Sequence, residues 1–159
     1  MQLSHYMTPQ SIVVPLAGTT KDQVLKELVE ELARRKNIPD AGRLLASIKD
    51  REDSASTFLP MGVAVPHARV AVVDEMTMIT GVAPAGVQDD PKQSPLTARI
   101  FCLFLSPTAE KEFGKHLKLL ARIAAVFSDP KLVDDIAVLT TPHDIFARIQ
   151  KRERQIDKE

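Results

Sequence analysis

The sequence predicts a single α/β domain, a sandwich in which helices cover both faces of a mixed β-sheet. Its 159 residues and its hydrophobic content of 44% are ordinary for one globular domain with one core. Segments with helical spacing open and close the chain, and short apolar runs typical of strands lie between them. No internal repeat, low-complexity tract or Gly/Ser linker divides the sequence. This order of elements indicates one α/β sandwich.

The first elements are a short β-branched run and a helix. The run Ile12 to Leu16, which Pro15 interrupts, is either an edge strand or the lead-in to the helix. Thr20 and Gln23 form a capping-box pattern, which predicts a helix over residues 21–36. The apolar residues that recur at helical spacing in this segment are Val24, Leu25, Leu28, Val29 and Leu32.

Four further helices are expected. One should begin after Asp40, its N-cap, and end at Asp50 or Arg51. Its buried face is formed by Leu44, Leu45 and Ile48. The other three cover residues 116–127, 130–139 and 142 to about 151, and the last two begin with an acceptor side chain before a proline. In the helix over 116–127, the residues expected to face the core are Leu117, Leu120, Ile123 and Ala124.

Three strands are predicted between the helices. Met61 to Val65 should form a short strand that Pro66 stops, because proline has no N–H for the ladder, and His67 would then lie just past the strand end. Glu75 to Val82 is a second strand. Ala98 to Leu105 is almost continuously apolar, as expected for a central strand covered on both faces.

Composition and charge argue against several classes of partner. Lysine plus arginine number 21 and aspartate plus glutamate also number 21, so no net charge attracts the chain to nucleic acid or to an anionic membrane surface. No apolar stretch approaches the roughly 20 residues that span a bilayer, and Met1 to Gln10 does not resemble a signal peptide. We therefore expect no direct membrane insertion and a cytoplasmic location.

The single cysteine and the end of the chain carry no predicted chemistry. Cys102 lies in the apolar run Ile100 to Leu105, where we expect it to be buried as a small hydrophobe, and this fits a reducing compartment. The last residues, 151–159, are almost wholly charged. They are expected to form a solvated or fraying C-terminal tail beyond a domain over 1–150.

Residues suited to phosphoryl chemistry concentrate between 50 and 70 and around His116. A histidine side chain is largely neutral near pH 7 and offers a nitrogen lone pair that can attack a phosphoryl group. An arginine such as Arg51 or Arg69 can neutralise the oxygens of that group with two parallel hydrogen bonds. Taken alone, however, His67 is more consistent with a structural turn histidine. For Arg51 the rival interpretation is a residue that ends its helix and binds the last carbonyls.

The order of these residues resembles the IIA component of the bacterial sugar phosphotransferase system, in its fructose, mannitol and nitrogen-regulatory branch. In that family an arginine precedes a Ser/Thr-containing loop, and a short apolar strand then ends in Pro-His at the phosphorylated histidine. Arg51, the pair Ser56-Thr57 and the segment from Gly62 to His67 match this pattern. A second histidine, which opens a Leu-rich helix in the family, matches His116, and the similarity spans nearly the whole chain.

The resemblance implies a phosphoryl carrier that accepts phosphate on His67 from a histidine phosphocarrier protein and passes it to a sugar-transport component. Arg51 would stabilise charge, and His116 would orient or hydrogen-bond the phosphoryl group. Thr57 and Arg69 would stabilise the phosphate further. No metal or organic cofactor is implied, and a zinc site would need about four ligands, whereas no suitably spaced Cys or additional His is present.

Two features leave other functions open. The loop after the threonine, usually glycine-rich in the family, is filled here by Phe58 to Met61. Glycines permit positive φ and close approach of the backbone to a phosphate, so their replacement either reshapes the loop or changes which partner docks there. The alternatives are a regulatory binding module whose phosphorylation state controls a transporter, kinase or transcription regulator, and a IIA-like domain that has lost phosphorylation.

Overall fold

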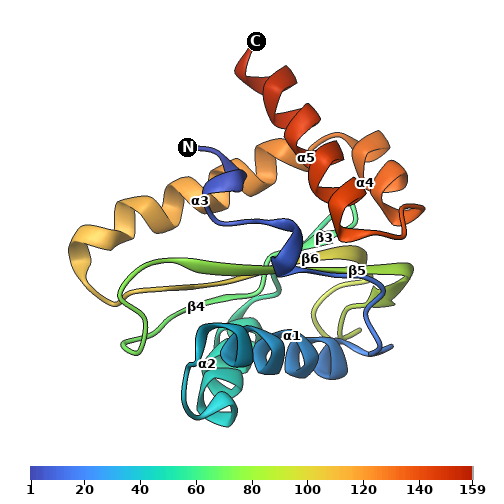
Figure 1. Ribbon diagram of the computed structural model, residues 1–159. Coiled ribbons are helices and arrows are strands. Elements are labelled where there is room, and N and C mark those ends of the chain that lie inside the picture. The colour runs from blue at the N-terminus through green and yellow to red at the C-terminus, as the bar shows by residue number, and fades with distance from the viewer. Residues whose placement is uncertain (159) are drawn as a thin grey trace.

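Two hydrophobic layers, one on each face of a mixed sheet, organise the protein (Figure 1). The computed structural model describes residues 1–158. On one face α1 (Lys21–Lys36) and α2 (Ala41–Ser54) pack against the sheet, and α3 (Phe113–Val126), α4 (Pro130–Ala137) and α5 (Pro142–Asp157) cover the other. The predicted α/β sandwich with helices on both faces is confirmed.

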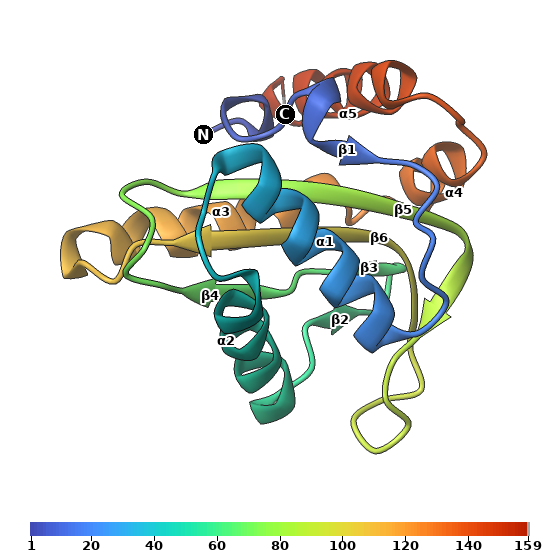
Figure 2. The ribbon, with the colours of Figure 1, turned by 60° about the horizontal axis from the view of Figure 1, so that its bottom comes forward.

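The sheet of the described residues is built around β6. Its strands are β1 (Ile12–Val13), β2 (Phe58–Leu59), β3 (Val63–Ala64), β4 (His67–Arg69), β5 (Thr77–Gln88) and β6 (Thr97–Ser106). The order is β1-β5-β6-β3-β2, and β4 also pairs with β6, as Figure 2 shows from below. Strand β6 pairs antiparallel with β5 and parallel with both β3 and β4. Because helices cover both faces of β6, its apolar run is buried, as predicted for the central strand.

The N-terminal half follows the sequence patterns closely. Helix α1 has the predicted bounds, and the side chain of Thr20 accepts a hydrogen bond from the N–H of Gln23. Of the two readings of the first run, the edge strand is confirmed, since β1 pairs parallel with β5. Helix α2 begins after Asp40 as predicted but continues to Ser54, so Arg51 lies within its last turn.

The strand around His67 differs from the prediction. Two short strands, β3 and β4, replace the single strand Met61 to Val65, and both lie beside β6. Pro66 interrupts the ladder as expected, but its carbonyl accepts the N–H of Phe104, so the chain stays next to β6. His67 therefore lies just past the end of β3, as predicted, and also opens β4. The second strand also runs longer than predicted, because β5 continues past Val82 through an irregularity in its pairing.

Helix α3 is rotated relative to the prediction, which is right for Ile123, leaves Leu120 half-buried against the core, and is wrong for Leu117. The side chain of Leu117 is 50% exposed, and the helix begins at Phe113, ahead of the expected start. The buried residues of the helix are His116, Leu119, Ile123 and Val126. Both sets have helical spacing, so periodicity alone did not decide between them. The observed rotation turns a histidine toward the sheet.

The expected solvated or fraying tail over 151–159 is helical in its described part, and most of its side chains are exposed. Helix α5 continues to Asp157, and Glu153 within it is only 3% exposed. The carboxylate of Glu153 accepts the N–H of Leu3 and pairs with Arg122, each at 2.8 Å. A buried carboxylate with two partners replaces the fraying end, and Glu159 lies outside the described residues.

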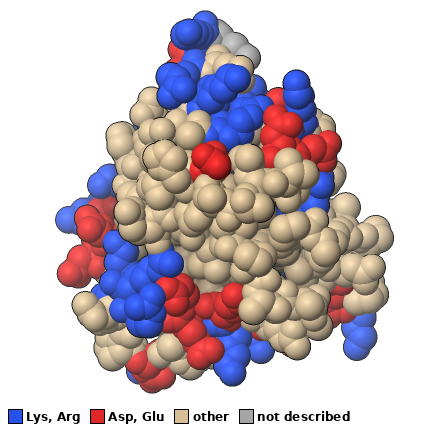
Figure 3. Space-filling model, turned by 45° about the vertical axis from the view of Figure 1, so that its right-hand side comes forward, with Lys and Arg blue, Asp and Glu red and all other residues tan. Residues whose placement is uncertain are grey.

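The surface carries both charge signs. Figure 3 shows Lys and Arg beside Asp and Glu at several places around an uncharged area, with basic side chains gathered near the C-terminal end of the chain. Among the described residues, no helix combines the length and the apolar character that a bilayer crossing requires.

Candidate functional site

His67 lies where β4 meets the end of β6. The two strands pair in parallel, with His67 opposite Phe104. The imidazole ring stacks on the Phe104 ring, with centroids 5.2 Å apart and an interplanar angle of 10°. Only 7% of His67 is exposed. The aromatic contact and the short strand hold the imidazole in one orientation at the edge of the core.

The hydrogen bond of His67 defines which ring nitrogen is free. Its Nδ1 lies 2.7 Å from the carbonyl oxygen of Val65, and a carbonyl only accepts, so Nδ1 carries the hydrogen. Burial lowers the pKa of His67, the Val65 carbonyl opposes this effect, and the charge of Arg51 adds to it. The ring is therefore neutral near pH 7, with an unprotonated Nε2. A neutral imidazole in this tautomer is a nucleophile at Nε2.

His116 completes an aromatic group around Phe104. Its ring centroid lies 5.2 Å from that of His67 and 5.1 Å from that of Phe104. The side chain is buried, and Nδ1 lies 2.6 Å from the hydroxyl oxygen of Ser106. Burial lowers the pKa of His116 to about 4, and His67, Arg69 and Arg51 add to the shift. The structure thus brings together the two histidines that the sequence separates by about fifty positions.

The two arginines flank this pair in different ways. Arg51 donates from Nη1 to the carbonyl oxygen of Ala55 at 2.8 Å, so it does bind the end of its own helix. Its charge nevertheless lowers the pKa of both histidines. The guanidinium of Arg69 lies 4.9 Å from the centroid of the Phe113 ring and donates to the carbonyl oxygen of Thr108 at 2.9 Å. The positive charge of Arg51 therefore acts on both histidines, and that of Arg69 acts on His116.

Thr57 is placed differently from the prediction that it stabilises phosphate directly. Its hydroxyl donates to Oε1 of Glu52, and its N–H donates to Oε2 of the same carboxylate at 2.9 Å. A hydroxyl has one hydrogen, and here Glu52 accepts it. The Thr57 carbonyl in turn accepts the N–H of Val65, whose own carbonyl holds His67. Thr57 thus supports the histidine through the backbone.

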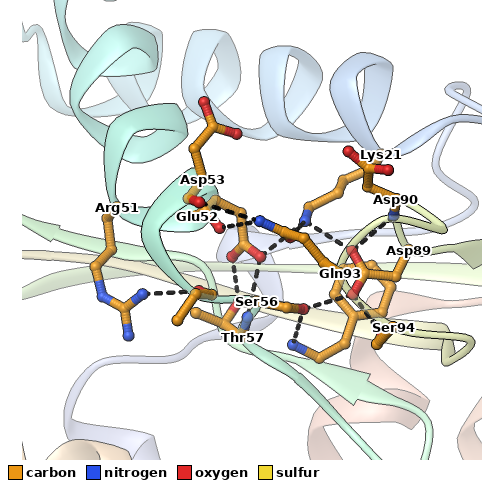
Figure 4. Close-up of polar contacts among 12 residues, drawn as sticks. Lys21, Arg51, Glu52, Asp53, Ser56, Thr57, Asp89, Asp90, Gln93 and Ser94 are labelled. Atoms are coloured by element: carbon orange, nitrogen blue, oxygen red, sulfur yellow. Dashed lines mark hydrogen bonds and ion pairs between the residues drawn. The ribbon is translucent and has the colours of Figure 1, made fainter.

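A buried ionic group holds the segment that carries Ser56 and Thr57 (Figure 4). We call this group, formed by Lys21, Glu52 and Asp89, the carboxylate latch. The ammonium of Lys21 lies 2.9 Å from Glu52 and 2.8 Å from Asp89. Asp89 also accepts hydrogen bonds from Ser56 and Ser94, each at 2.6 Å. Burial opposes the charges on Lys21 and Asp89, but their mutual contact and hydrogen bonds outweigh it, raising the pKa of Lys21 and lowering that of Asp89.

The latch was not predicted, although one signal for it is present in the sequence. Glu52 follows Ile48 by four positions, which puts a charged residue on the buried face of α2. Nothing local to Lys21 or Asp89 indicates that they meet, because the segments that carry them lie far apart in sequence. The latch therefore depends on the packing of α1 and of the β5–β6 connection against the end of α2.

The apolar segment Phe58 to Met61 forms part of the sheet and of the core. Phe58 and Leu59 form β2, which pairs antiparallel with β3, and Gly62 takes the positive φ of 91° that the connection requires. Phe58 is buried and packs edge-on against Phe101, with ring centroids 5.7 Å apart. Its side chain therefore belongs to the core and not to a docking surface.

No metal centre emerges from these side chains. Across residues 1–158, no three His, Cys, Asp or Glu residues are grouped as ligands to one ion would be.

We expect His116 to titrate near pH 4, below the ordinary value of 6.5. Between these two values the His116 side chain binds more protons in the unfolded chain than in the folded protein. The contribution of His116 to the free energy of unfolding is therefore complete above about pH 6.5 and falls as the pH drops toward 4. NMR titration of the imidazole measures the pKa, and His116→Gln should flatten this part of the stability profile. A titration midpoint at or above 6 would contradict the burial argument.

We expect Lys21→Met to destabilise the protein by about 3 kcal/mol at pH 7, because two buried carboxylates then lose their shared cation. Urea unfolding at pH 7 measures the loss. The matched control is Lys49→Met, because the side chain of Lys49 is 38% exposed and its ammonium lies 3.9 Å from the exposed Asp22. This variant should change the free energy of unfolding by less than about 0.5 kcal/mol. Equal losses in the two variants would show that the latch contributes nothing specific.

Comparison with known proteins identifies the family. The model of the phosphoenolpyruvate-dependent sugar phosphotransferase system EIIA 2 family matches residues 5–152. The chain is 25% identical over 146 residues to a nitrogen regulatory protein of Pseudomonas aeruginosa, covering 92% of this chain and 93% of that protein. It is 26% identical over 147 residues to a mannitol-specific phosphotransferase enzyme IIA component of Staphylococcus aureus, covering 90% and 94%.

Solved structures agree in fold. The nitrogen regulatory protein IIA-Ntr of Neisseria meningitidis superimposes with a TM-score of 0.79 at 23% identity, over 92% of this chain and 98% of that one. The mannitol IIA enzyme of Escherichia coli, in its complex with phosphorylated enzyme IIB, gives a TM-score of 0.73 at 17% identity, over 91% and 97%. With the family model matching from residue 5 to residue 152, the chain belongs to the EIIA type 2 family of the phosphoenolpyruvate-dependent sugar phosphotransferase system.

Proposed function

We propose that the protein is a phosphoryl carrier that accepts a phosphoryl group on Nε2 of His67 from a histidine phosphocarrier protein and passes it to a downstream sugar-transport component. The observation that carries the proposal is the fixed tautomer of His67. The Val65 carbonyl occupies Nδ1 and leaves the lone pair of Nε2 as the nucleophile.

In the proposed transfer, Nε2 of His67 forms a bond to phosphorus while the phosphorus–nitrogen bond of the donor breaks. The electron pair of the broken bond returns to the donor imidazole. The hydrogen on Nδ1 of His67 stays in place, and the Val65 carbonyl stabilises the positive charge that the ring gains. The charges of Arg51 and Arg69 offset the phosphoryl oxygens, so positioned side chains supply the catalysis and no metal or organic cofactor is invoked.

The surface beside His116 supports a protein donor. Phe113 and Leu117, one turn apart on α3, are 43% and 50% exposed. Large apolar side chains that remain exposed next to a reactive group are typical of a site where a partner protein docks. For the downstream step, the mannitol IIA enzyme of Escherichia coli forms a complex with phosphorylated enzyme IIB. We propose a corresponding EIIB-type acceptor for this chain, and a cytoplasmic location in keeping with its single buried Cys102.

Intact-mass analysis tests the proposal after incubation with phosphoenolpyruvate, the general phosphotransferase enzyme and its carrier protein from the source cell. We expect a gain of one phosphoryl group, about 80 Da, that mild acid removes. His67→Ala should show no gain, and His143→Ala, which replaces an exposed histidine on α5, should label like the wild type. Equal labelling of wild type and His67→Ala would refute the assignment of His67.

A regulatory role is the second candidate, favoured by the similarity to nitrogen regulatory proteins over more than 90% of both chains. In this case the charge on phosphorylated His67 changes which protein the chain binds. Pull-downs with wild type, His67→Asp and His67→Ala, followed by identification of the captured proteins, test it. We expect a transporter, kinase or transcription regulator whose recovery differs between wild type and His67→Asp. Recovery of no such partner with any of the three would argue against regulation.

A further inference from the structure

Ser106 and His116 form a buried pair at the end of β6. Ser106, the last residue of the strand, is fully buried, and its hydroxyl oxygen lies 2.6 Å from Nδ1 of His116. The Ser106 carbonyl accepts the N–H of Val70 at 2.8 Å, which fixes the backbone of this residue. Among the described residues, the hydroxyl makes no hydrogen bond other than the one to His116.

The lack of a second partner determines the direction of this hydrogen bond. If Nδ1 carried a hydrogen, it would donate to the hydroxyl oxygen, and the buried hydroxyl hydrogen would have no acceptor within residues 1–158. A buried donor without an acceptor is strongly disfavoured. When the hydroxyl of Ser106 donates to Nδ1, both groups are satisfied. His116 then carries its hydrogen on Nε2.

The two histidines thus hold opposite tautomers. In His67 the Val65 carbonyl holds the hydrogen on Nδ1, which leaves Nε2 bare, whereas in His116 Ser106 leaves Nδ1 bare and the hydrogen on Nε2. The ring centroids are 5.2 Å apart. His67 offers a lone pair that can bond to phosphorus, and His116 offers an N–H that can donate to an oxygen of the phosphoryl group on His67.

We propose that Ser106 is a positioning residue that holds His116 in the Nε2–H tautomer, so that this N–H donates to an oxygen of the phosphoryl group on His67. The role in transfer rests on the proposed function, whereas the tautomer assignment does not. Ser106 acts only through His116 and does not contact the reacting atoms.

Long-range ¹H–¹⁵N NMR of the imidazoles in the wild-type protein tests the tautomer directly. We expect a pyridine-type Nδ1 and a protonated Nε2 for His116, and the reverse for His67. In Ser106→Ala the Nδ1 resonance of His116 should move toward that of a nitrogen without a hydrogen bond. Thr80→Val, which removes another buried hydroxyl from the neighbouring strand β5, should leave it unchanged. A hydrogen on Nδ1 of wild-type His116 would overturn the proposal, whether or not any variant folds.

A double-mutant cycle tests the role in transfer. Ser106→Ala should slow phosphoryl transfer to His67 by about 2- to 10-fold, the usual worth of one hydrogen bond, and Ser106→Thr should restore part of the rate. In a His116→Gln background the same Ser106→Ala change should have no further effect. Additive losses would overturn the role through His116. If wild-type His67 takes no phosphate while His116 shows the expected tautomer, the proposed function fails and the tautomer assignment stands.

Discussion

The parallel pairing of β4 with the end of β6 is the constraint on which the site depends. It places His67 opposite Phe104, whose ring lies against both imidazoles. The same strand end supplies Ser106, which contacts His116. Because both faces of β6 are covered by helices, its side chains have little freedom to move. A rigid strand thus supports each histidine, while Pro66 interrupts the ladder just enough for His67 to turn toward the carbonyl of Val65.

Buried polar groups are accommodated in two opposite ways. The histidines lose their charge, since burial and nearby cations lower the pKa of both rings. Glu52 and Asp89 remain paired with Lys21. A neutral imidazole has a lone pair that can act as a nucleophile. The paired ions instead join three segments that lie far apart along the chain. Through Thr57 and Val65 the ionic group supports the backbone that holds His67.

Much of the architecture follows from local patterns in the sequence. Helix α1 and the central strand were predicted because capping residues and a long apolar run are local signals. His67 and His116 were predicted as a pair from the family resemblance, and the structure places their rings in contact. The rotation of α3 was not predicted, because two sets of residues fit the same helical period.

Other features depend on contacts that no local pattern encodes. Glu52 and Glu153 are both buried. The spacing of Glu52 from Ile48 indicates its buried position, but the distant cations and backbone N–H groups that meet the two carboxylates are not encoded locally. The hydroxyl of Thr57, expected as a donor to phosphate, donates here to Glu52, because the position of Glu52 decides where the hydroxyl hydrogen goes. Residue type predicts which groups can hydrogen-bond, but only the tertiary arrangement selects the partner.

The ion pair between Arg122 and Glu153 has a consequence for the site at the far end of α3. Arg122 lies on the same helix as His116, and Glu153 also binds Leu3, 150 positions away along the chain. The N-terminal segment and α5 are therefore joined, through one buried carboxylate, to the helix that carries His116. Residues that lie far from the chemistry thus contribute to positioning one of the two histidines.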